Sequence, residues 1–156
     1  MWQPFVGKQS TVEINWVERG AVRAFAEAIG DRNPLYIDEE VAKKSRYHRC
    51  MAPPTFPMTF RYGTIQGLPM PASGLIHGQQ VFHYTRRLFV GDQVFCSQML
   101  KDVYEKVGSL GRLSFLVFER VGEDHEGEHM FTNTETYIIT EIVRKSMEGN
   151  KSDGTN

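Results

Sequence analysis

The sequence predicts an α+β protein in which helices come first and four long antiparallel strands follow. Two features of the chain support this prediction. An amphipathic stretch over about residues 17–29 lies near the N-terminus and ends at a glycine. From residue 75 onward, apolar and polar residues alternate between turn sequences at 91–92, 108–111 and 122–128. We therefore expect one antiparallel sheet, with the helices gathered on one of its faces.

The N-terminal part is expected to form a short strand and then a helix. Residues 11–14 have strand character, and Asn15 followed three positions later by Glu18 has the spacing of a capping box. The apolar residues that follow share one helical face, and Gly30 stands where a left-handed cap ends a helix. The predicted helix covers about residues 17–29.

Two further helices are expected before the sheet. The first is short and covers residues 39–44. The second follows the Ala-Pro-Pro-Thr sequence at 52–55, because proline is tolerated in the first turn of a helix. Residues from 55 to about 65 are mostly apolar on all sides, which is typical of a helix buried on most of its faces. Its large residues either shape a ligand tunnel or are plain core: Phe56, Phe60 and Tyr62.

The four strands are expected from residue 75, over 94–104, over 113–121 and over 131–143. A single domain over residues 1–146 accounts for all of these elements. The remaining residues, 147–156, are mostly Gly, Ser, Asn, Asp and Lys, and we expect them to be disordered.

Composition excludes several classes of function. The net charge of −1 provides no field that would hold nucleic acid or an anionic membrane, so neither is expected as a partner. No apolar run has the length of a membrane span, and no signal peptide is recognisable, so we expect a cytoplasmic protein. Cys50 and Cys96 lie far apart and are expected to be free thiols. The histidines show no metal-ligand spacing, and no metal or cofactor is expected.

Three sequence blocks together resemble the MaoC-like dehydratases, the R-specific enoyl-thioester hydratases. The first is Ala-Ile-Gly-Asp-Arg-Asn-Pro-Leu-Tyr-Ile-Asp at 28–38, and the second is Met-Ala-Pro-Pro-Thr-Phe-Pro at 51–57. The third is Leu-Ile-His-Gly-Gln-Gln at 75–80, continuing through 86–92 and 103–106. The resemblance implies a hotdog fold, in which a long antiparallel sheet wraps around a central helix. The second block is similar to the N-terminal type of MaoC domain.

The resemblance implies a hydro-lyase of fatty-acid metabolism that acts on acyl-CoA or acyl carrier protein (ACP) thioesters. In the family, an Asp and a His hold the water that adds to a 2-enoyl thioester. This chain keeps the acid as Asp31 but has Tyr36 at the histidine position. A phenol has an unperturbed pKa of about 10 against about 6.5 for imidazole, so it is a poor base at neutral pH. Losing a positioned acid–base group typically lowers the rate ~10²–10⁴-fold.

Each residue of this first block also has a purely structural interpretation. Asp31 after a helix-ending glycine can simply brace a turn, as Asn33 can before a proline. Tyr36 either donates a hydrogen bond in the site or fills the space left by the missing histidine. The family resemblance favours a site position for Asp31, and Tyr36 and Asn33 are the other candidate catalytic positions.

The other two blocks supply candidates for substrate binding. Pro54 and Thr55 stand where the family stabilises the thioester oxygen at the start of the central helix. Proline has no N–H to donate, so the Thr55 N–H is the candidate donor. His77 is either part of a substrate groove or an ordinary strand residue, and Gly78 beside it suggests a close backbone approach.

Four arginines could meet the phosphates of the substrate: Arg46, Arg49, Arg86 and Arg87. Two adjacent strand residues face opposite sides, so we expect that Arg86 and Arg87 cannot both line one groove.

Two assemblies are compatible with these features. One is a homodimer that uses Asp31 with Tyr36. The other is a heterodimer in which this chain binds substrate and a second MaoC-like chain supplies the missing histidine. The alternatives are a non-catalytic module that binds acyl-CoA and, with less support, a hotdog thioesterase.

Overall fold

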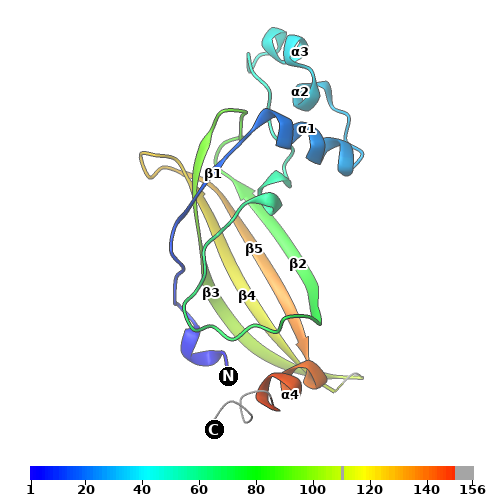
Figure 1. The fold of residues 1–156 in the computed structure, drawn as a ribbon, viewed down its shortest axis with the longest axis vertical. Coiled ribbons are helices and arrows are strands. Elements are labelled where there is room, and N and C mark those ends of the chain that lie inside the picture. Colours follow the sequence, from blue (N-terminus) through cyan, green and yellow to red (C-terminus); the bar gives the residue numbers. More distant parts are fainter. Residues whose placement is uncertain (110, 150–156) are drawn as a thin grey trace.

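The computed structural model describes residues 1–109 and 111–149. Its centre is a five-stranded antiparallel sheet in the order β1-β3-β4-β5-β2 (Figure 1). The strands are β1 (Glu13–Trp16), β2 (Leu75–Tyr84), β3 (Gln93–Gly108), β4 (Gly111–Glu123) and β5 (His129–Thr140). The predicted α+β class is confirmed, and the four long strands fall close to their predicted positions. β2 is an edge strand, and along the described residues only β5 pairs with it.

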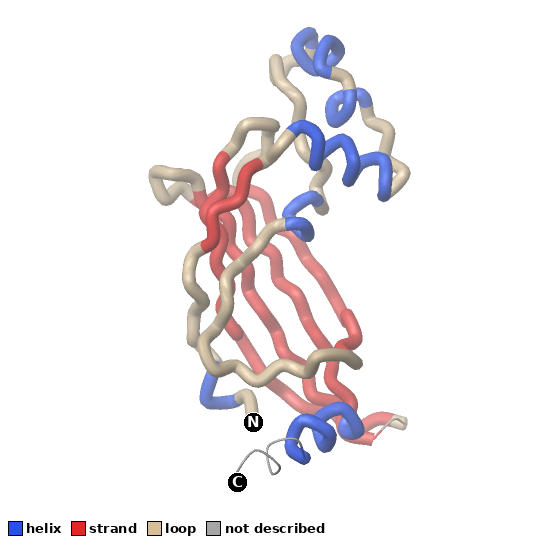
Figure 2. Tube along the Cα trace, viewed as in Figure 1, coloured by secondary structure: helices blue, strands red, loops and turns tan. Residues whose placement is uncertain are grey.

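Three helices gather at one end of the sheet, and this differs from the predicted layer on one face (Figures 1 and 2). They are α1 (Arg19–Ala28), α2 (Pro34–Ile37) and α3 (Glu39–Lys44). Gly30 has a φ of +72°, the left-handed cap predicted for the end of α1. The predicted capping box is wrong. Glu18 is the N-cap and makes no side-chain cap bond, whereas Asn15 lies in β1.

The predicted central helix over 55–65 is also wrong. Only a single 3-10 turn forms, η2 (Phe56–Thr59), and the chain from residue 60 to 74 crosses the sheet as a loop (Figure 2). Side chains from other elements bind the backbone groups that a helix would pair internally. Asn15 accepts from the Arg61 N–H and donates to the Arg61 carbonyl, both at 2.9 Å. Ser10 donates to the carbonyl of Tyr62 at 2.6 Å. These hydrogen bonds hold the segment extended along β1.

A fourth helix was not predicted. The structure has α4 over Glu141–Gly149, so β5 ends at Thr140 and the predicted strand does not continue to residue 143. Residues 147–149, assigned from sequence to a disordered tail, belong to this helix. The rest of that tail, residues 150–156, lies outside the described residues. α4 and the N-terminal 3-10 turn η1 (Gln3–Phe5) lie at the end of the sheet opposite α1–α3 (Figure 1).

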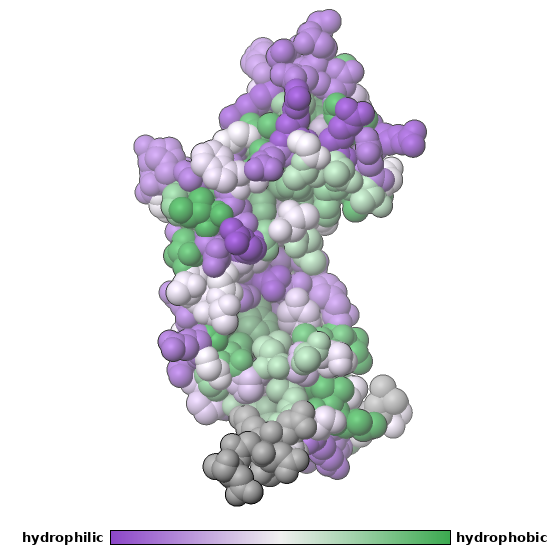
Figure 3. Space-filling model, viewed as in Figure 1, coloured by the Kyte–Doolittle hydropathy of each residue, from purple (hydrophilic) through white to green (hydrophobic). Residues whose placement is uncertain are grey.

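The buried residues form two separate hydrophobic clusters. One joins the helical end to the sheet through residues such as Phe56, Leu88 and Phe131. The other, which includes Leu116 and Ile139, lies toward α4. Between them the inner face of the sheet carries polar side chains, including the fully buried Asn133 and Glu135. Figure 3 shows that the molecular surface is indented between the helical end and the rest of the sheet.

Candidate functional site

The turn between α1 and α2 uses its polar side chains to hold its own backbone. The Asp31 carboxylate accepts a hydrogen bond from the Asn33 N–H at 3.1 Å. The Asn33 side-chain oxygen accepts from the Leu35 N–H at 3.0 Å and so caps α2. Both side chains therefore fulfil the structural roles open to them from the sequence. One oxygen of Asp31 is engaged by these contacts, and the turn presents Tyr36 inward.

Tyr36 is 7% exposed and lines a pocket of about 400 Å³. This is within the size range of small-molecule sites. The pocket lies between α2, the loop before η2 and the segment that follows β2. Its lining residues are Tyr36, Met51, Ala52, Pro54, Tyr84, Thr85, Arg86, Arg87 and Leu88. We call this the Tyr36 pocket.

Backbone hydrogen bonds set the walls of the Tyr36 pocket. The Met51 N–H donates to the Leu35 carbonyl at 3.0 Å, which ties the loop to α2. The next residue, Ala52, donates to the Leu88 carbonyl at 2.9 Å, which ties the same loop to the segment after β2. The Tyr84 hydroxyl donates to the Pro54 carbonyl. The pocket therefore depends on contacts among three segments that are distant in sequence.

Tyr36 enters the pocket as a neutral phenol. Burial raises its pKa, the charge of Asp31 raises it further, and Arg87 partly opposes both. A phenol with a raised pKa holds its proton at neutral pH. It can donate a hydrogen bond to water or to a carbonyl oxygen, but it cannot act as a general base there.

The prediction that Arg86 and Arg87 cannot line one groove is wrong. β2 ends at Tyr84, and the chain bends at the following residues, so the strand alternation no longer applies. Both arginines line the Tyr36 pocket. Arg86 forms an ion pair with Asp92 at 2.9 Å. No carboxylate pairs with Arg87 in the described residues, and its guanidinium lies 5.2 Å from the Tyr47 ring centre.

The structure does not support the predicted oxyanion donor, the Thr55 N–H at the start of a central helix. η2 has only four residues, so there is no helix whose dipole could support the Thr55 N–H. Thr55 is exposed and is not among the residues that line the pocket, whereas Pro54 is. Pro54 contributes its ring to the wall, and its carbonyl is already bound by Tyr84. The donors on the pocket wall come from tyrosine and arginine side chains.

His77 and Gly78 lie elsewhere, toward the other end of β2. Gly78 sits at a β-bulge, and a Cβ there would come within 2.9 Å of the Ile138 side chain, which confirms the predicted close approach. His77 Nε2 lies 3.3 Å from a carboxylate oxygen of Glu135. Sequence reasoning assigned no role to Glu135, although a Glu on the same strand face as Phe131 and Ile139 was a recognisable signal.

The folded protein should lose stability at alkaline pH because the pKa values of three tyrosine side chains are raised on folding. Burial raises the pKa of Tyr36, Tyr62 and Tyr84 in the folded protein, whereas a phenol in the unfolded chain ionises near pH ~10. Their stabilising contribution is fully present below pH ~10 and is lost as pH rises toward the folded pKa values. We expect the urea midpoint to fall between pH ~9 and ~11. Tyr62→Phe should reduce this fall and Tyr104→Phe, at an exposed position, should not. A midpoint independent of pH over this range would contradict the prediction.

Comparison with known proteins identifies the family. The model described as "FAS1-like, dehydratase domain region" matches residues 4–133. The chain belongs to this family. A UPF0336 protein of Streptomyces avermitilis is 34% identical over 155 residues, covering 94% of this chain and 96% of the relative. The FAS1-like dehydratase region is a MaoC-like hotdog domain, so the predicted family is confirmed.

Solved structures confirm the hotdog fold. A C-terminally truncated HadBC (3R-hydroxyacyl-ACP dehydratase) complex from Mycobacterium tuberculosis is 21% identical, with a TM-score of 0.75 over 88% of this chain and 99% of that chain. The ChsH1–ChsH2 complex from the same organism is 24% identical, with a TM-score of 0.69 over 85% of this chain and 84% of that chain. Within the described residues, no helix combines the length and apolar character needed to cross a membrane.

Proposed function

We propose that this FAS1-like dehydratase-region protein is the substrate-binding subunit of a hydratase/dehydratase that acts on acyl-CoA or acyl-ACP thioesters. Hydration adds the hydroxyl of water to C3 of a 2-enoyl thioester and a proton to C2, and dehydration reverses these steps. The proposal rests on one observation: Tyr36 is a buried neutral phenol in the Tyr36 pocket. It can bind a substrate oxygen, but it cannot take the proton that the family's histidine takes.

The remaining contacts of the site agree with a binding role. Asp31 and Asn33 are bound to backbone groups of their own turn, as a structural brace would be. Arg86 and Arg87 place positive charge at the pocket, which suits the phosphates of CoA or of a carrier-protein arm. The base is therefore expected from a second MaoC-like chain with an intact Gly-Asp-x-Asn-Pro-x-His sequence.

The free edge of β2 offers the means of joining that second chain. β2 is ten residues long and pairs with β5 on one side only within the described residues, and Leu75 and Ile76 on it are 37% and 44% exposed. A long unprotected edge strand readily takes up another strand. We propose that β2 pairs with the sheet of a second hotdog domain. Two of the structural neighbours, HadBC and ChsH1–ChsH2, are themselves complexes of two chains.

Hydration of crotonyl-CoA tests the proposal. We expect the chain alone to be slower than its complex with the second chain by ~10²–10⁴-fold, the usual effect of a positioned acid–base group. Asp31→Asn should leave the slow rate of the single chain unchanged. A rapid single-chain rate that Asp31→Asn abolishes would instead show a self-sufficient homodimer. Tight binding of acyl-CoA with no effect on a partner's rate would support a non-catalytic module.

A further inference from the structure

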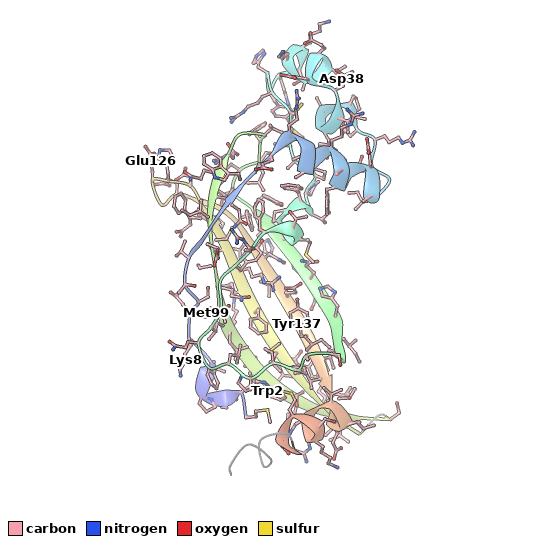
Figure 4. All side chains as sticks on the ribbon, in the orientation of Figure 1. Trp2, Lys8, Asp38, Met99, Glu126 and Tyr137 are labelled. Atoms are coloured by element: carbon pink, nitrogen blue, oxygen red, sulfur yellow. The ribbon has the colours of Figure 1, made fainter. Side chains whose placement is uncertain are left out.

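A row of polar side chains crosses the inner face of the sheet between the two hydrophobic clusters. We call it the polar belt, and it consists of Gln98 on β3, Arg120 on β4, Asn133 and Glu135 on β5, and His77 and Gln80 on β2. Asn133 and Glu135 are 0% exposed. The Arg120 side chain is 17% exposed, and that of His77 is 46% exposed at the sheet edge. Tyr137, which borders the belt, lies in the middle of the sheet, far from Asp38 at the helical end (Figure 4).

The belt contains buried polar atoms that the protein itself does not satisfy. Neither side-chain atom of Asn133 has a hydrogen-bond partner within the described residues. The Glu135 carboxylate, by contrast, is in contact with Arg120, His77 and Tyr137. Arg120 lies against one oxygen of Glu135 and His77 lies 3.3 Å from the other, so charge is balanced without well-directed hydrogen bonds. A buried polar group that lacks its partner destabilises the folded protein. The unpartnered Asn133 amide beside a buried carboxylate calls for an explanation, and a bound polar group is one.

The belt can be reached from the surface at its Gln98 and Arg120 end. A hollow of about 220 Å³ lies beside it, under the loop that replaces the central helix. Gln98, Arg120 and Tyr137 line this hollow together with residues of that loop. Gln98 also donates to the Gly63 carbonyl at 2.7 Å, so the loop is held over the hollow and does not fill it. A continuous central helix would cover this part of the sheet.

The belt also lies in line with the Tyr36 pocket. Tyr84 lines the pocket and pairs with Phe131 on β5. The next pairs along the same face are Phe82 with Asn133 and then Gln80 with Glu135. Four residues of strand span ~13 Å, at about 3.4 Å for each residue. An extended chain that starts in the pocket and follows β2 therefore passes an aromatic surface first and the polar belt next.

We propose that the polar belt recognises an uncharged hydrogen-bonding group, a hydroxyl or an amide, on the extended chain of an acyl-thioester ligand. This inference rests on the thioester-binding role proposed for the Tyr36 pocket. The ligand group is uncharged because Arg120 already balances Glu135. It must donate a hydrogen bond, since the Glu135 oxygens only accept, and the Asn133 amide can both accept and donate. A plain hydrocarbon would leave the Asn133 amide unpaired.

Two parts of a thioester carry this chemistry: the amides of a pantetheine arm and a hydroxyl on the acyl chain. Calorimetric binding to the purified chain distinguishes them. One arm compares an acyl-pantetheine thioester with the S-ethyl thioester of the same acid. The other compares acyl-pantetheines of equal length that carry one hydroxyl at successive positions with the unsubstituted compound. Asn133→Leu tests the belt, and Thr134→Val, on the opposite face of β5, is the matched control.

We expect one arm to show a preference of about tenfold for the ligand with the added group, the size of one or two net hydrogen bonds. Asn133→Leu should abolish the preference and Thr134→Val should retain it. Glu135→Gln, which keeps the shape of the side chain, should reduce it if Asn133→Leu does not fold. Binding of all thioesters with equal affinity would overturn this inference and leave the proposed function intact. No binding of any thioester would overturn both.

Discussion

A Gly63→Ala variant should lose roughly 3 kcal/mol or more of unfolding free energy. Gly63 has a φ of +72°, a conformation that a side chain makes unfavourable by ~1–2 kcal/mol. A Cβ at this position would also lie 2.1 Å from the Thr11 carbonyl oxygen, so the two segments would have to separate. That separation breaks the contacts that hold the 60–74 loop along β1. Urea unfolding monitored by circular dichroism measures the change.

Gly67→Ala is the matched control for this variant. Gly67 lies in the same loop and has nearly the same backbone angle, a φ of +75°, but its Cβ would meet nothing closer than 3.7 Å, at the Phe5 ring. We expect it to lose only the conformational part, ~1–2 kcal/mol. Equal losses in the two variants would show that the close approach of Gly63 to Thr11 has no energetic importance.

An Arg87→Glu variant should bind an acyl-CoA thioester ~10–100-fold more weakly, the effect of a lost charge-assisted hydrogen bond of ~1.5–3 kcal/mol. Arg87 lines the Tyr36 pocket, and no ion pair of the described residues occupies it. Arg86 beside it is already held by Asp92, which leaves Arg87 as the cation available to a phosphate. The loss should be small for an acyl-pantetheine thioester, which has no phosphate, and should shrink at high salt.

Lys44→Glu is the control for Arg87→Glu. Lys44 is exposed on α3 at the same end of the molecule, lies outside the pocket lining, and undergoes the same change of charge. We expect its acyl-CoA affinity to stay within a factor of about two, because exposed charges outside a site are largely screened. Equal weakening of CoA and pantetheine thioesters by Arg87→Glu would indicate lost pocket shape and would contradict a phosphate contact.

The local elements were predictable because their signals lie in neighbouring residues. The amphipathic period and the glycine after it were enough to place α1, although the cap residue was wrong. The long strands followed from alternation and from turn sequences such as Gly91-Asp92. The close packing of β5 against Gly78 was predictable for the same reason, because a glycine within a strand is itself the signal.

The central helix was not predictable, because residues far away decide it. An apolar stretch after two prolines has the composition of a buried helix, and nothing within residues 55–65 excludes one. Asn15, Ser10 and Gln98 supply hydrogen bonds to that stretch from elements on both sides of it in the sequence. Once those partners are in place, the backbone N–H and C=O groups of the extended segment have hydrogen-bond partners, and the segment also covers the sheet.

The candidate site likewise combines features that neighbouring residues determine with features that distant residues determine. Tyr36 was identified as the decisive residue from its place in the motif, and that residue does line the main pocket. Arg86 and Arg87 were misjudged because the end of β2, which sets their directions, is decided by pairing with β5. Thr55 was expected to gain from a helix that does not form.

By itself, the sequence determined the α+β class, the family and the replacement of histidine by Tyr36, since each is a property of residue types in order. Only the tertiary structure decided which side chains share a pocket, that the central helix is replaced by a loop, and that the Asn133 amide is buried without a hydrogen-bond partner. The physical reason is that hydrogen-bond satisfaction and burial depend on all groups within contact distance, most of which are distant in the chain.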